Sequence, residues 1–135
     1  FRFLTLAQWV QMPNMEEEIK KEGLSEWARY ARIWVERFAP ESDKFLVQKE
    51  LPDVSGLSLT QRAYLKSLIG LFEKDINAEE LQTEIYEKSK EMDLKSVDAF
   101  KAIYTAFLGK DHGPKAAWLL QSLEKDFVTQ RLSKI

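Results

Sequence analysis

The sequence contains no cysteine and a single histidine, His112. Without cysteine, a disulfide framework, a thiolate zinc site and a cysteine nucleophile are excluded. One histidine cannot build a multi-histidine metal site. Long hydrophobic runs are missing too, since no stretch reaches the roughly 18 apolar residues that a membrane span needs, and no signal-peptide pattern is present. The sequence predicts a protein without a membrane partner, and we expect it in the cytoplasm.

Motifs for independent catalysis are also scarce. The sequence has no glycine-rich phosphate loop, no strand–turn–helix nucleotide site and no nucleophile elbow. Glu80, Glu84 and Glu87 would share one face of a helix, where carboxylates can gather around a metal, but glutamates on helix surfaces are usually solvated. We therefore predict no catalytic residue and no metal site in this chain.

What the sequence does have is the composition of a folded domain. Its 135 residues are 44% hydrophobic and 12% aromatic, which is enough to bury a core. This length suits one domain over residues 1–135. The chain begins with Phe1 rather than methionine, and its apolar opening suggests a piece cut from a longer protein.

The formal net charge of −2 is unevenly distributed along the chain. Residues 1–37 are neutral overall, residues 38–100 carry −5 and residues 101–135 carry +3. Nucleic-acid-binding domains often have a strong positive excess, and here only the C-terminal end is basic. Charge alone favours ordinary surface variation over a nucleic-acid site.

Helix signals run through the chain, and no convincing hairpin signal lies between them. Six apolar residues recur at the helical period and predict a helix with one apolar stripe: Trp27, Tyr30, Ala31, Trp34, Val35 and Phe38. Other signals mark helix ends. Asn14, Ser58, Asn77 and Ser96 are expected N-caps, Gly23 and Gly109 are expected to end helices, and Pro114 is expected at a first helical position. Together these signals predict an all-α fold of seven or eight helices.

The stretch from Lys101 to Trp118 combines cations with an aromatic side chain, which is the chemistry of single-stranded RNA recognition. A helix beginning at Pro114 would point free N–H groups toward a phosphate, and Gly113 would let a base or phosphate approach the backbone. The alternative is that Trp118 belongs to the core, because apolar residues flank it. Local chemistry alone favours that alternative.

The same region resembles the C-terminal end of the class I lysyl-tRNA synthetases. That family ends with an aromatic-Lys-Ala-Ile/Leu-Tyr helix, a Leu-Gly-Lys turn, a Gly-Pro helix start and a closing Asp-Phe-Val…Arg-Leu element. The matching segments here are FKAIYTAFLGKDHGPKAAWLL at 100–120 and KDFVTQRL at 125–132, preceded by WVERFAPE at 34–41, LTQR at 59–62 and IYE at 85–87. The resemblance covers about residues 1–132.

This resemblance implies an anticodon-binding domain of the α-helix cage type. In the family, a Rossmann-type catalytic domain with HIGH and KMSKS signatures activates lysine with ATP and Mg²⁺, and neither signature occurs here. The helical C-terminal part holds the anticodon end of the lysine tRNA. The resemblance thus implies a lysine–tRNA ligase as the parent protein, with tRNA(Lys) and the catalytic domain of the same chain as partners. The piece itself is expected to hold no cofactor and to catalyse nothing.

The expected contacts with tRNA follow from this resemblance and from the chemistry of the basic end. Cations would neutralise phosphates of the anticodon loop, planar groups would support unstacked bases, and the turn at 109–113 would read uracil edges. We expect Lys110, Lys115 and Arg131 at phosphates, Trp118 and Arg32 at bases, and His112 and Gly113 in the turn. The family often has Arg where Lys115 stands and Gly where Ala117 stands, and lysine keeps the charge but loses the planar fork.

Two alternatives stay open at this point. The same kind of module occurs in glutamyl- and glutaminyl-tRNA synthetases, and the glutamyl enzymes end in a related Gly-Pro element. The second alternative is a helical protein-interaction domain without RNA binding.

Overall fold

The computed structural model describes residues 2–40 and 43–135, and all regular structure within them is helical. Within these ranges, eight α-helices and the 3₁₀-helix η2 follow one another, which confirms the predicted all-α fold. The chain forms two compact units, Phe1–Val47 (unit 1) and Gln48–Ile135 (unit 2). That residues 1–135 form one domain stays a prediction.

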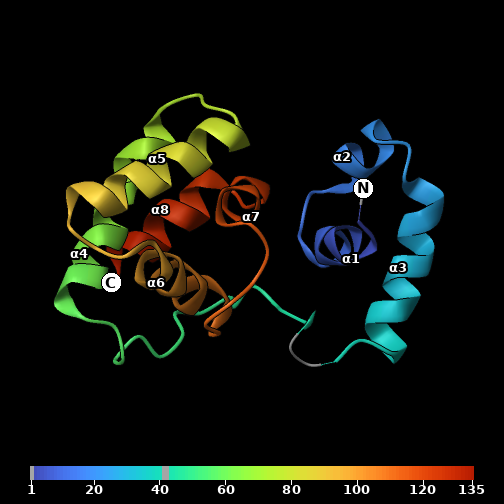
Figure 1. The fold of residues 1–135 in the computed structure, drawn as a ribbon, viewed down its shortest axis with the longest axis horizontal. Helices are drawn as coiled ribbons and strands as arrows, with labels where there is room; N and C mark the ends of the chain where they lie inside the picture. Colours follow the sequence, from blue (N-terminus) through green and yellow to red (C-terminus); the bar gives the residue numbers. More distant parts are fainter. Residues whose placement is uncertain (1, 41–42) are drawn as a thin grey trace. The chain divides into compact units, whose positions relative to one another are not determined.

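Unit 1 is built from three helices, α1 (Phe3–Gln11), α2 (Glu16–Lys21) and α3 (Ser25–Arg37), which pack against one another (Figure 1). The side chain of Gln11 closes the unit after α3. Its Nε2 donates to the Asp43 carbonyl at 2.9 Å, and its Oε1 accepts from the Phe45 N–H at 2.9 Å. One glutamine thus ties the segment that follows α3 to the end of α1.

The apolar stripe expected on α3 does not coincide with the buried face of that helix. Ala28 and Ala31 are buried, whereas Trp27 is 59% and Tyr30 is 48% exposed. Small side chains let α3 lie close to α1, and the larger aromatic residues are left beside this seam. There the rings of Phe3 and Trp34 meet edge to face, with centroids 5.6 Å apart. The sequence period predicted the helix correctly, and Ala31 of the predicted stripe is buried. Trp34 and Val35 are half-buried, and the prediction is wrong for the exposed Trp27, Tyr30 and Phe38.

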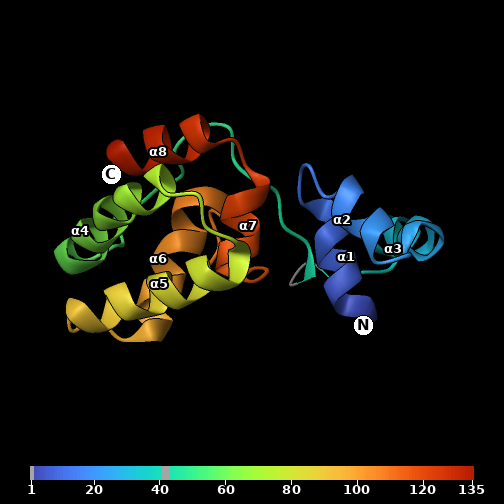
Figure 2. The same ribbon diagram turned by 90° about the horizontal axis from the view of Figure 1, so that it is seen from above.

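Unit 2 surrounds one central helix, α6 (Ser96–Leu108), which contacts four of its neighbours (Figure 2). The buried residues of α6 combine three alanines with three large side chains, so the surrounding helices fit closely around it: Ala99, Ala102, Ile103, Ala106, Phe107 and Leu108. The other elements of the unit are α4 (Leu59–Ser67), η2 (Leu68–Glu73), α5 (Ala78–Glu91), α7 (Ala116–Ser122) and α8 (Lys125–Ser133).

Three of the expected helix ends in unit 2 are confirmed. Ser58 and Gln61 form a reciprocal capping box at the start of α4. Asn77 Oδ1 accepts from the Glu80 N–H at 2.8 Å and caps α5. Gly109 ends α6 in the left-handed conformation, with φ of +69°.

Three expected helix starts are wrong. Lys95, not Ser96, is the N-cap of α6. Met15, not Asn14, is the N-cap of α2, and Asn14 itself is left-handed with φ of +60°. Pro114 lies before α7, whose N-cap is Lys115, because the Pro114 carbonyl accepts a hydrogen bond from the Tyr104 side chain of α6. Gly23, in contrast, follows α2 with φ of +71°, as expected.

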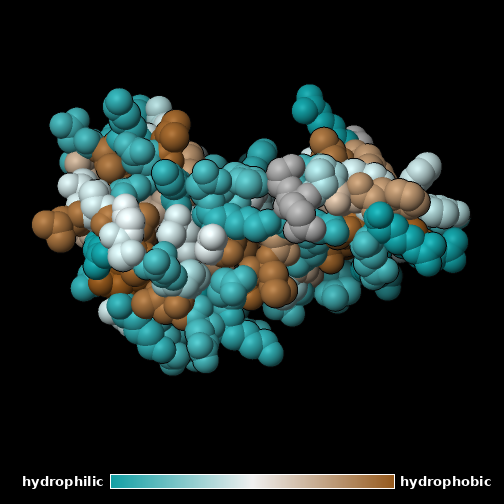
Figure 3. Space-filling model, turned by 90° about the horizontal axis from the view of Figure 1, so that it is seen from below, coloured by the Kyte–Doolittle hydropathy of each residue, from teal (hydrophilic) through white to brown (hydrophobic). Residues whose placement is uncertain are grey.

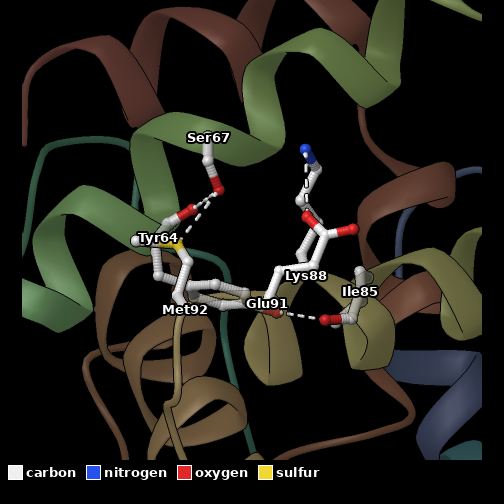
Figure 4. A network of polar contacts seen from close by, with 6 residues as sticks. All are labelled: Tyr64, Ser67, Ile85, Lys88, Glu91 and Met92. Atoms are coloured by element: carbon white, nitrogen blue, oxygen red, sulfur yellow. Dashed lines mark hydrogen bonds and ion pairs between the residues drawn. The ribbon is translucent and has the colours of Figure 1, made fainter.

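A fully buried tyrosine links α4 to α5 (Figure 4). The Tyr64 hydroxyl donates to the Ile85 carbonyl at 2.8 Å, and burial raises the pKa of this phenol. The Ser67 hydroxyl donates to the Tyr64 carbonyl at 2.6 Å and lies 3.8 Å from the sulfur of Met92. A buried hydroxyl needs such a partner, and the bond from Tyr64 to Ile85 fixes the register of α4 and α5.

The surface of the protein is mixed, with hydrophobic patches among hydrophilic side chains on the face drawn in Figure 3. The most exposed large apolar residues are Trp27, Phe38, Leu46, Leu59 and Val97. None of the helices in the described ranges combines the length and the apolar character that crossing a membrane requires.

Candidate nucleic-acid interface

The residues between α6 and α7, Gly109 to Lys115, form the α6–α7 turn, and both ends of this turn are fixed to α6. The Tyr104 hydroxyl donates to the Pro114 carbonyl at 2.6 Å, and burial raises the pKa of Tyr104 to about 12. The Thr105 hydroxyl lies 3.4 Å from the Lys110 carbonyl. The turn therefore presents its side chains from a backbone that is already ordered, which lowers the entropy that binding has to offset.

Gly113 is needed in this turn because its backbone lies directly on α6. A Cβ at this position would meet Leu108 Cδ1 at 2.7 Å and Tyr104 Cδ1 at 3.1 Å. The space that the sequence assigned to an approaching base or phosphate is thus occupied on this side by the protein's own side chains. Gly113 supports the site by close packing.

Replacing Gly113 with alanine is expected to lower the free energy of unfolding of unit 2 by about 2 kcal/mol, because overpacking a closed contact typically costs 1–3 kcal/mol. Urea titration followed by circular dichroism measures this change. Gly56→Ala is the control, since a Cβ there would meet nothing within 4 Å, and it should leave stability unchanged or slightly higher. Equal effects of the two substitutions would contradict the packing argument.

The turn gathers positive charge beside an aromatic ring. Lys115 Nζ lies 5.2 Å from the centroid of the Trp118 ring, within the range of a cation–π contact. Trp118 is half-buried and packs its other side against the core of unit 2. Lys110 is also half-buried, in the same turn. The Trp118 ring is thus both part of the core and partly open. A core position and a position beside an RNA base are therefore compatible for Trp118.

His112 and Asp111 form an exposed pair at the tip of the turn. The His112 Nδ1 lies 2.8 Å from Asp111 Oδ1. This hydrogen bond is the main reason that the pKa of the Asp111 carboxyl is lowered, and the nearby charge of Lys101 adds to the shift. The pair presents a donor and an acceptor side by side, which is the kind of polar edge that can pair with an unstacked base.

The start of α7 offers less to a phosphate than the sequence predicted. The Ala117 N–H donates to Gln82 Oε1 of α5 at 3.0 Å, so the protein itself uses this group. The helix has only seven residues. Any attraction of this region for anions therefore comes from the lysines of the turn and not from the N-terminus of α7.

Comparison with known families agrees with this geometry. The family model described as an anticodon binding domain matches residues 14–135, which is most of the chain and all of the α6–α7 turn. The chain belongs to this anticodon-binding domain family. The family resemblance and the class of function predicted from the sequence are thereby confirmed.

The relatives of this anticodon-binding domain are archaeal lysine–tRNA ligases. The enzyme of Archaeoglobus fulgidus is 31% identical over 116 residues, which cover 86% of this chain and 23% of that protein. The enzyme of Thermoplasma acidophilum is 34% identical over 146 residues, covering 98% of this chain and 29% of that protein. The enzyme of Thermococcus kodakarensis is 31% identical over 151 residues, which cover 98% of this chain and 28% of that protein. The chain spans less than a third of the length of these relatives.

The seven expected tRNA contacts fall into three groups in this anticodon-binding domain. Five of them lie together in the α6–α7 turn and the first turn of α7: Lys110, His112, Gly113, Lys115 and Trp118. Arg32 is exposed on α3 of unit 1. Arg131 is buried on α8, where it donates to the carbonyls of Ala106 and Gln48 at 2.8 Å and 2.6 Å. Its hydrogen bonds give Arg131 a structural role, and its contact with phosphate stays a prediction.

Sequence reasoning missed the residues that position the turn. Tyr104 of α6 holds the turn itself at Pro114, and Gln82 of α5 holds the start of α7 at Ala117, each by a single hydrogen bond. Nothing in the sequence marks these side chains, because their partners lie 10 and 35 residues away along the chain and come close only through helix packing. Tyr104 is the tyrosine of the aromatic-Lys-Ala-Ile-Tyr segment of the family. In the structure, its hydroxyl holds the turn at Pro114.

Proposed function

We propose that this chain is the anticodon-binding part of a lysine–tRNA ligase and that its α6–α7 turn contacts the anticodon loop of tRNA(Lys). The observation that carries the proposal is the contact of Lys115 with the half-open Trp118 ring, beside a turn that also carries Lys110 and whose backbone is fixed in advance. Family membership and the names of the relatives support it.

In the proposed mechanism, each kind of group in the turn has a separate task. Lys110 and Lys115 neutralise loop phosphates and release the counterions bound to them. The open part of the Trp118 ring supports a base that has left the stack. The polar edge formed by His112 and Asp111, together with the backbone of the turn, supplies donors and an acceptor for uracil, whose edge has both.

The whole ligase would attach lysine to its tRNA in the cytoplasm, with ATP and Mg²⁺ held by a catalytic domain of the same polypeptide. In the ranges 2–40 and 43–135, no three carboxylate or imidazole side chains gather closely enough to hold a metal ion. The role of this chain is recognition, and the chemistry belongs to the catalytic domain.

The double substitution Lys110→Gln with Lys115→Gln is expected to weaken binding of the tRNA(Lys) anticodon stem-loop about tenfold at 0.15 M salt. Each single-strand phosphate contact contributes about 0.7 to the slope of log K against log salt, so the slope should flatten by about 1.4. Fluorescence anisotropy titrations at several salt concentrations measure both quantities.

The matched control is Lys66→Gln with Lys95→Gln, because these two lysines are also exposed in unit 2 but lie on α4 and at the opposite end of α6. The control should bind as the unchanged protein does. Unchanged affinity and slope for the turn variant would overturn the placement of the site. Tighter binding of a tRNA(Glu) stem-loop than of the tRNA(Lys) stem-loop would favour a glutamyl enzyme as the parent, and equally weak binding to all RNAs would favour a protein-interaction domain.

A further inference from the structure

A second basic site lies in unit 2 at the C-terminal helix, and of the tRNA contacts expected from the sequence it includes only Arg131. It is a cavity of about 200 Å³ between α8 and the segment at residues 49–51. Seven residues line it: Lys49, Glu50, Leu51, Phe127, Gln130, Arg131 and Lys134. Three of them are cations and one is a carboxylate. The cations come from positions up to 85 residues apart, so the charge is concentrated by folding and not by a run in the sequence.

Arg131 is the unusual member of this lining, because its charge is buried without an anionic partner. Its side chain is 4% exposed, and its guanidinium lies 4.8 Å from the centroid of the Phe127 ring. Within the described residues, no carboxylate forms an ion pair with it. Buried charges in proteins are normally paired. This guanidinium therefore lacks the counter-charge that its environment calls for.

The hydrogen bonds of Arg131 leave part of its donor capacity open. A guanidinium has five N–H donors. Nη1 and Nη2 each donate to one carbonyl, of Ala106 and Gln48, and these bonds fix the plane of the group. The remaining donors belong to a side chain that lines the cavity. An oriented guanidinium with spare donors is the group that proteins prefer for holding phosphate.

The rim of the cavity adds two mobile cations to this fixed one. Lys49 and Lys134 are exposed, and Glu50 is the single acidic residue of the lining, so the formal charge of the cavity is +2. A volume of about 200 Å³ holds a phosphate together with bridging waters, at about 30 Å³ of liquid volume per water. The size, the charge and the spare donors all suit one phosphodiester group.

The segment at residues 48–52 links this cavity to the α6–α7 turn. The Gln48 N–H donates to the Phe107 carbonyl at 2.8 Å, at the end of α6. Pro52 Cβ lies 3.6 Å from the position that a Cβ on Gly109 would take. The segment at residues 48–52 thus touches the first residue of the turn and also carries the rim of the cavity, so the two basic sites are neighbours on unit 2.

We propose that this cavity, formed by Lys49, Arg131 and Lys134, is a second phosphate site that holds a backbone phosphate of the same tRNA whose anticodon loop contacts the α6–α7 turn. The inference rests on the proposed function, since it assigns the cavity to the same ligand. RNA leaving the turn follows the segment at residues 48–52 to the cavity, where the buried guanidinium receives its missing counter-charge. The site contributes affinity and orientation and reads no base.

The test is the double substitution Lys49→Gln with Lys134→Gln, which removes the rim and leaves Arg131, and with it the fold, in place. We expect binding of an intact tRNA(Lys) transcript to weaken about tenfold at 0.15 M salt, with a salt slope flatter by about 1.4. Urea unfolding of the variant should match that of the unchanged protein. The Lys66→Gln, Lys95→Gln control should lose neither affinity nor slope.

The outcomes separate this inference from the proposed function. If the turn variant weakens binding and the cavity variant does not, the cavity is not a phosphate site and the proposed function stands. If neither weakens binding, both fail. An equal loss in the Lys66, Lys95 control would show that only overall charge matters, which also overturns the inference. A fourfold-substituted protein that loses about a hundredfold in affinity would support two independent contacts.

Discussion

Replacing Tyr64 with alanine is expected to lower the free energy of unfolding of unit 2 by about 4 kcal/mol, within the 3–5 kcal/mol range seen when a large buried aromatic side chain is truncated. Tyr64 is completely buried between α4 and α5, and its hydroxyl is bonded to the Ile85 carbonyl. The substitution removes the ring, leaves a cavity and deletes the hydrogen bond. Urea denaturation followed by circular dichroism measures the loss.

The phenylalanine variant divides this effect into its parts. Tyr64→Phe keeps the ring and removes only the hydroxyl, so it should cost about 1 kcal/mol, the net value of a typical hydrogen bond. If Tyr64→Phe costs as much as Tyr64→Ala, the hydrogen bond and not the packing of the ring holds α4 against α5.

Arg131→Met is expected to lower the free energy of unfolding by about 3 kcal/mol. Methionine fills much of the same space but donates no hydrogen bond, so the buried carbonyl of Ala106 and the partly buried carbonyl of Gln48 lose the bonds from Arg131. Each buried group left unsatisfied costs about 1–3 kcal/mol, and relief of the buried charge offsets part of that cost. The same denaturation experiment gives the value.

The control for this substitution is Arg32→Met. Arg32 is exposed on α3, and substitutions at such surface positions usually change stability by no more than about 0.5 kcal/mol. An Arg131→Met variant as stable as Arg32→Met would mean that the two carbonyls find other partners, and Arg131 would then be free of its structural role.

The helices of this protein were predictable where a local signal decides the structure. Three such signals are the Ser58–Gln61 capping box, the Asn77 cap and the left-handed Gly109. Each depends on groups within three or four residues of one another, so the local sequence determines it. Local signals failed where a distant group intervenes. Pro114 is a good first residue for a helix, but its carbonyl is held by Tyr104, and the helix begins at Ala116 instead.

The buried face of α3 shows a second limit of local reasoning. Hydrophobic periodicity marks the residues that can be buried, and it does not tell which edge of a broad apolar stripe meets the neighbouring helix. Close contact with α1 selects the alanines Ala28 and Ala31, and the larger side chains Trp27 and Tyr30 are left at the surface. Volume, which periodicity ignores, decided this outcome.

The candidate site was half predictable for the same reason. Lys110, His112 and Lys115 follow one another in the sequence, so a basic turn could be predicted from their order. The cavity could not, because Lys49 and Lys134 become neighbours only when the segment after unit 1 packs along α8. The sequence placed Arg131 among the expected phosphate contacts, and only its burial in the structure reveals a charge that lacks an anionic partner.

The hydrogen bond from Arg131 to the Gln48 carbonyl has a consequence for synthesis on the ribosome. It joins residues 83 positions apart, at the two ends of unit 2. At translation rates of about 5–20 residues per second, Arg131 is made roughly 4–17 s after Gln48. Unit 1, whose internal contacts end by Val47, can fold cotranslationally in that interval. Unit 2 has to wait for α8, because this contact cannot form before Arg131 has been synthesised.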